Sequence, residues 1–102
     1  MITIIDYGMG NLGSIYNMLK RIGAASVITE DPAVICKATK ILLPGVGAFD
    51  NAMMRINEKG LHEVLDRKAL VEKVPVLGIC LGMQLLMRSS EEGKLPGLGW
   101  ID

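Results

Sequence analysis

The sequence predicts an α/β protein in which one parallel sheet, of flavodoxin-like or Rossmann-like type, is covered by helices on both faces. Two observations carry this prediction. Short apolar runs alternate with longer segments whose apolar residues recur at helical spacing, in the order βαβαβααβα. Half of the residues are hydrophobic but only 4% are aromatic, so the core is aliphatic, which suits strands packed between helices.

The first half of the chain supplies three strands and two helices. Asn11 and Asp31 are good N-cap residues, and Pro32 suits the first position of a helix. The strands are short apolar runs that end at turn-forming residues. The expected elements are the strand Ile2–Ile5, the helix Asn11–Ile22, the strand Ala25–Thr29, the helix Pro32–Cys36 and the strand Lys40–Leu43.

The second half supplies three helices and one strand. At 102 residues the chain can bury one small core, and no linker interrupts it, so we expect one domain or part of one. After the last helix, Leu98, Trp100 and Ile101 look like the beginning of a strand that has nothing to pair with. The expected elements are the helices Phe49–Ile56 and Leu61–Glu72, the strand Val76–Ile79 and a helix from Leu81 to about Ser90.

Three glycine-rich loops follow strands: Tyr7–Asn11, Pro44–Gly47 and the turn around Cys80. In a parallel sheet with right-handed crossovers, the carboxyl ends of the strands lie at one edge, where such folds bind ligands. The sequence therefore predicts the functional site at this edge.

Cys80 lies at the turn from the fourth strand into the last helix. Gly78 and Gly82 flank it in the G-x-Cys-x-G pattern that is typical of a nucleophile elbow. The helix N-terminus favours the thiolate, and the N–H of Leu81 is the usual first donor of an oxyanion hole. The alternative is a structural cysteine buried in the core, which is the commoner role of a lone cysteine. The glycine pair favours the nucleophile.

Other polar groups have weaker patterns. The second oxyanion donor is expected from the backbone amide of Val46 or Gly47, in the loop after a neighbouring strand. The alternative is that Pro44–Gly47 is only an ordinary turn that ends the strand. Gln84, one helical turn after Cys80, faces either the site or solvent. His62 is the only histidine, and its place at the start of a polar covering helix predicts a surface residue. A basic partner for the cysteine is therefore missing from the sequence.

A rival interpretation is a dinucleotide site. Gly8, Gly10 and Gly13 match G-x-G-x-x-G between a strand and a helix, and Glu30 ends the second strand where a ribose-binding acid is expected. This interpretation leaves the elbow at Cys80 without a role. The glycines alternatively serve only to let the helix pack closely on the strand.

Charge and cysteine content exclude several classes of protein. Eleven basic and eleven acidic residues give a net charge of zero, so nothing favours nucleic acid or an anionic membrane as partner. Two cysteines are too few for a disulfide framework, and we expect no metal and no cofactor. Without a leader-like segment or an apolar stretch of spanning length, we expect a cytoplasmic protein.

Three motifs together resemble the class I (triad) glutamine amidotransferases. They are IDYGMGNL at 5–12, LPGVGAF at 43–49 and GICLGMQLL at 78–86, and the likeness covers all 102 residues. The elbow marks the superfamily, whereas the first motif is far more specific. Within the family, the set resembles the glutaminases that supply ammonia to a partner cyclase in histidine biosynthesis.

The resemblance implies that Cys80 forms a thioester with glutamine, and that the amides of Val46 and Leu81 form the oxyanion hole. The ammonia released passes through a tunnel to a heterodimeric partner, a cyclase of β/α-barrel type. The resemblance further implies glutamine contacts from Gly47, Gln84 and Glu92, and a position toward the partner for Asn11 and its loop.

The family completes its triad with a His and a Glu two residues apart, in a C-terminal half, and this sequence has no His-x-Glu pair. We therefore expect residues 1–102 to be the N-terminal portion of one amidotransferase domain, and to be nearly inactive alone. Three alternatives stay open: a non-catalytic module that binds the cyclase, an amidotransferase subunit of a related synthase and, remotely, a dinucleotide-binding domain.

Overall fold

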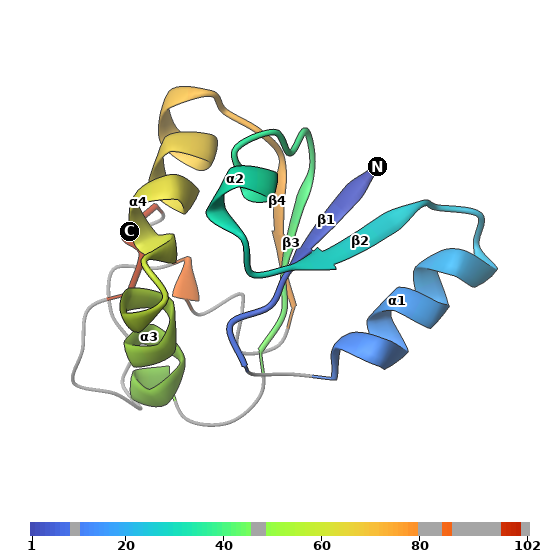
Figure 1. The fold of residues 1–102 in the computed structure, drawn as a ribbon, viewed down its shortest axis with the longest axis horizontal. Coiled ribbons are helices and arrows are strands. Elements are labelled where there is room, and N and C mark those ends of the chain that lie inside the picture. Colours follow the sequence, from blue (N-terminus) through green and yellow to red (C-terminus); the bar gives the residue numbers. More distant parts are fainter. Residues whose placement is uncertain (9–10, 46–48, 80–84, 87–96, 101–102) are drawn as a thin grey trace.

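A computed structural model of the chain describes residues 1–8, 11–45, 49–79, 85–86 and 97–100. Within them lies one four-stranded sheet whose strands are all parallel, in the order β2-β1-β3-β4 (Figure 1). This is the flavodoxin-like order, in which β2 lies on one side of β1, and β3 and β4 follow on the other side. The strands are β1 (Ile2–Ile5), β2 (Ser26–Thr29), β3 (Ile41–Leu43) and β4 (Val76–Gly78).

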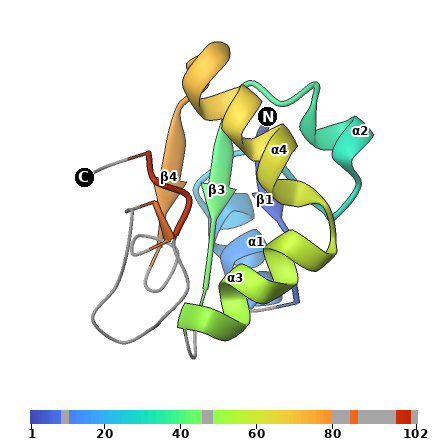
Figure 2. The same cartoon turned by 90° about the vertical axis from the view of Figure 1, so that its left-hand side faces the viewer.

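Helices cover both faces of this sheet, as predicted (Figure 2). Successive side chains of a strand point to opposite faces, so the apolar strands build two separate clusters. Ile4 and Leu42 pack with Leu19 of α1 on one face. Ile5 and Leu43 pack on the other face, against α2, α3 and α4. The helices are α1 (Leu12–Arg21), α2 (Pro32–Ile35), α3 (Phe49–Glu58) and α4 (Leu61–Asp66).

Two of these helices begin at N-cap residues that the sequence predicted. The side chain of Asn11 accepts a hydrogen bond from the N–H of Ser14 at 3.3 Å, and so caps α1. Asp31 caps α2 by accepting from the N–H of Ala33 at 2.9 Å, with Pro32 in the first helical position. Both caps agree with the sequence analysis.

The segment after α4 departs from the expected α-helix. Residues Arg67–Val71 form a π-helix, η1. Lys68 lies inside it, and only 2% of this residue is exposed. Its ammonium group donates to the carbonyl of Cys36 at the end of α2 and to the carboxylate of Glu72, each at 2.9 Å. The contact with Glu72 is local, four residues along the chain, whereas the contact with Cys36 joins residues 32 positions apart, so no local sequence pattern could predict it.

We expect Lys68→Ala to destabilise the chain by about 2–3 kcal/mol. The substitution removes a buried side chain and leaves the carbonyl of Cys36 without its donor. Lys59 offers a matched control, because it also forms an ion pair, with Glu30 at 2.8 Å, but on the surface. Lys59→Ala should cost at most about 0.5 kcal/mol in the free energy of unfolding, measured in urea. Equal costs for the two variants would contradict the buried role of Lys68.

Residues 97–100 correct one expectation. Leu98 and Trp100 belong to no strand in the described part of the chain. They nevertheless find backbone partners, because their N–H groups donate to the carbonyls of Leu85 and Leu86 at 2.7 and 2.8 Å. The indole of Trp100 also donates to Asp66 at 2.7 Å. The segment therefore packs against α4 rather than extending the sheet.

Candidate active site

The carboxyl ends of β1, β3 and β4 lie side by side at one edge of the sheet (Figure 1). Leu43 is in register with Gly78, and the N–H of Ile79 donates to the carbonyl of Leu43 at 3.0 Å. The hydrogen-bond ladder between β3 and β4 thus continues to Ile79, the last described residue of this segment. Two loops predicted to carry chemistry are therefore entered from neighbouring strands.

Most of the predicted site residues lie outside the described residues. One undescribed segment begins directly after Gly45, which is buried beyond the end of β3. Another begins directly after Ile79. The structure describes the strands that lead to these residues, and it does not describe the residues themselves. The predicted residues in question are Cys80, Leu81, Gln84, Val46, Gly47 and Glu92.

A buried tyrosine connects two loops at this edge. Tyr7 follows β1 by two residues and is fully buried, and its hydroxyl donates to the carbonyl of Pro44 after β3. Burial removes the phenol from water and raises its pKa well above the ordinary value of 10.0, so the hydroxyl stays protonated and donates. The sequence analysis assigned no role to Tyr7. Its partner lies 37 residues away, and no sequence signal marks such a contact.

The next residue, Gly8, has a backbone conformation that favours glycine. Its φ is +87°, in the left-handed region that glycine adopts without strain. A Cβ atom at this position would lie 2.8 Å from Nη1 of Arg55 on α3, the end of a flexible side chain that can move aside. The side chain of Asp6 closes the turn by accepting from the N–H of Gly8 at 3.0 Å. The guanidinium of Arg55 is therefore a positive charge beside the loop after β1.

Asn11 and His62 are described. Asn11 is exposed at the start of α1, which is compatible with both a capping role and contact with a partner. The imidazole of His62 lies on α4, 37% exposed, with Nδ1 3.2 Å from Asn57 and Nε2 3.5 Å from Asp66. His62 is thus a surface residue, as the sequence analysis expected.

The dinucleotide interpretation finds no support in the described residues. A Cβ at Gly13 would meet nothing within 4 Å, so this glycine does not serve close packing of the helix on the strand. Glu30 forms an ion pair with Lys59. Gly10 lies outside the described residues. The structure thus gives the third glycine no close-packing role and places the acidic residue in a surface ion pair.

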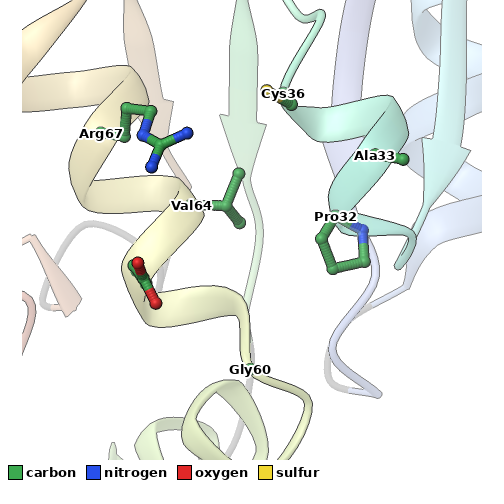
Figure 3. Close-up of a pocket in the computed structure, with 7 residues that line it drawn as sticks. Pro32, Ala33, Cys36, Gly60, Val64 and Arg67 are labelled. Atoms are coloured by element: carbon green, nitrogen blue, oxygen red, sulfur yellow. The ribbon is translucent and has the colours of Figure 1, made fainter.

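A groove of about 360 Å³ lies between α2 and α4 (Figure 3). Cys36 has an exposed free thiol on one side of the groove, and Arg67 lies on the other. Among the described residues, no group of three or more His, Cys, Asp or Glu could hold a metal ion. The groove is lined by Pro32, Ala33, Cys36, Gly60, Glu63, Val64 and Arg67.

No helix in the described ranges has the length and apolar character needed to cross a membrane.

Comparison with known proteins gives consistent matches. The family model described as glutamine amidotransferase class-I matches residues 3–94. Imidazole glycerol phosphate synthase subunit HisH 2 of Methanococcus maripaludis is 60% identical over 102 residues, which are 100% of this chain and 50% of that protein. Subunit HisH of Bdellovibrio bacteriovorus is 54% identical over 101 residues, 99% of this chain and 50% of that protein. The chain thus spans about half the length of these curated relatives.

Proposed function

The chain belongs to the class I glutamine amidotransferase family, and from this membership we propose that it carries the nucleophile and the oxyanion hole of a glutaminase. The observation that supports this most directly is the pairing of β3 with β4. Because these strands are parallel neighbours, the segments that follow Gly45 and Ile79 leave the same edge of the sheet. A nucleophile at Cys80 and an amide at Val46 then start from the same edge of the sheet, from which both can reach one substrate carbonyl.

In the proposed reaction, the thiolate of Cys80 attacks the carboxamide carbon of glutamine and forms a C–S bond. The amides of Val46 and Leu81 stabilise the negative oxygen of the tetrahedral intermediate. The C–N bond then breaks, and the nitrogen takes up a proton and leaves as ammonia. Water hydrolyses the remaining thioester to glutamate and regenerates the thiol. Gly47, Gln84 and Glu92 hold the glutamine in this proposal.

The proton transfers need a base that the described site does not offer. His62 is paired with Asn57 and Asp66 on the surface of α4, so we do not assign it this role. We propose that the base is a His-Glu pair of the type the family uses, carried by a polypeptide segment outside these 102 residues. Residues 1–102 then form the N-terminal portion of one amidotransferase domain.

The names of the relatives point to the ammonia acceptor. The curated relatives are subunits of imidazole glycerol phosphate synthase. We therefore propose that this chain works in a heterodimer with the cyclase subunit of such a synthase, in histidine biosynthesis. The exposed Asn11 and its loop face this partner in the proposal.

Reconstitution tests the proposal. The chain is mixed with the other half of the Methanococcus maripaludis relative, made as a separate polypeptide, and with the cyclase of that synthase. Glutamate release from glutamine is then measured. We expect activity only in the full mixture, with the chain alone lower by at least about a thousandfold, because the members of a catalytic triad act as a unit.

The same mixture separates the enzyme from a non-catalytic module. If the three polypeptides associate by size-exclusion chromatography and release no glutamate, the glutaminase proposal is wrong. Binding of the cyclase by an inactive assembly would instead support the module.

A further inference from the structure

The strongest feature that the proposed function leaves unused is the bond between Tyr7 and Pro44. Tyr7 is one of the largest fully buried side chains of the described residues, and Pro44 is also fully buried. The bond crosses from the end of β1 to the end of β3. In the order β2-β1-β3-β4 this is the point where the strand order reverses, and open α/β sheets bind their ligands there.

The hydroxyl of Tyr7 is not needed to fill the core. Its ring packs in the apolar cluster between the sheet and the helices α3 and α4. A phenylalanine ring would occupy nearly the same volume there. A buried hydroxyl is instead costly unless it forms a hydrogen bond, and here it donates to a backbone carbonyl. The hydroxyl group therefore holds the Pro44 carbonyl in place and contributes little to the packing of the Tyr7 ring.

Holding that carbonyl fixes more than one atom. A peptide unit is planar, so the orientation of the Pro44 carbonyl also determines the direction of the N–H of Gly45. The chain that follows contains Gly45 and Gly47, and glycines leave a backbone with wide conformational freedom. The bond to Tyr7 thus supplies a fixed starting direction for a segment whose own sequence restrains it weakly.

We infer that Tyr7 is a positioning residue for the oxyanion hole: through the carbonyl of Pro44 it orients the backbone that leads to the amide of Val46. This inference rests on the proposed glutaminase function. Tyr7 touches neither substrate nor nucleophile in this role. Its hydroxyl acts on the reaction only by limiting the orientations of the peptide at the end of β3.

Tyr7→Phe tests the inference, because it removes the hydroxyl and keeps the ring. In the reconstituted assembly we expect kcat for glutamine hydrolysis to fall about 10- to 100-fold, less than the full loss of an oxyanion donor. The KM for glutamine should stay within about threefold of the wild-type value, because the substitution weakens an interaction with the transition state and not the binding of glutamine itself. The rate at which iodoacetamide alkylates Cys80 should not change, because that reaction needs no oxyanion hole.

Tyr16→Phe is the matched control. Tyr16 is the other tyrosine of the chain, 38% exposed on α1, and its loss of a hydroxyl should leave all three quantities unchanged. An active wild-type assembly in which Tyr7→Phe keeps the wild-type kcat would overturn the inference and leave the glutaminase proposal intact. A parallel loss of kcat and of the alkylation rate would also overturn it, because it would show a general disturbance of the site. An inactive wild-type assembly refutes the glutaminase proposal itself.

Discussion

Cys80→Ala in the reconstituted assembly is expected to lower glutamine hydrolysis by at least about a thousandfold. The proposed reaction passes through a thioester on this sulfur, and an alanine side chain can form no such bond. The measurement is the rate of glutamate release at saturating glutamine, together with the amount of cyclase bound. Binding of the cyclase should not change, because the substitution removes one small group.

Cys36→Ala is the matched control for this experiment. Cys36 is exposed in the groove between α2 and α4, away from the carboxyl edge of the sheet. Its replacement should leave the rate within about twofold, as is usual for surface positions. A second measurement uses diazo-oxo-norleucine, an alkylating mimic of glutamine, which should add its mass to the peptide with Cys80 and not to that with Cys36. Labelling confined to Cys36, or full activity without Cys80, would refute the assignment of the nucleophile.

Phe49→Ala should cost about 3–5 kcal/mol in the free energy of unfolding. Phe49 is the first residue of α3 and is 1% exposed, in the cluster between the sheet and the α3 and α4 layer. Removing its ring leaves a cavity that the surrounding residues fill only in part. Since domains of this size have a total stability of about 5–15 kcal/mol, the variant should unfold at much lower urea concentration, measured by far-UV circular dichroism.

Met54 provides the comparison for Phe49 within the same helix. It is 48% exposed, on the outer side of α3, so Met54→Ala should change the stability by less than about 0.5 kcal/mol. The contrast tests which side of α3 packs on the sheet. Similar losses for both variants would show that α3 does not bury the face that the structure assigns to it.

The strands and the starts of the helices could be predicted because their signals are local. The strand Ile2–Ile5 was predicted with the observed bounds, and the predicted strands at 40–43 and 76–79 differ from the observed ones by one residue. A cap such as Asp31 accepts from an N–H two residues away, so it can be predicted from neighbouring residues in the sequence. The match to the family model also agrees with the resemblance drawn from three short motifs.

The contacts that the sequence analysis missed connect distant positions. The carbonyl that Lys68 binds belongs to Cys36, and the carbonyl that Tyr7 binds belongs to Pro44. The partners of Leu98 and Trp100 are backbone groups of Leu85 and Leu86. A lysine, a tyrosine or a short apolar run has many possible partners, and their choice depends on which elements become neighbours in space.

The sequence by itself determined the class of fold, the alternation of strands and helices, and the family, because periodicity, capping and turn chemistry act over a few residues. Only the tertiary structure decided the order β2-β1-β3-β4, and with it which strand ends lie side by side. It also decided that the phenol of Tyr7 is buried against the carbonyl of Pro44. The reason is physical: packing and burial select contacts by proximity in space, which separation along the chain does not specify.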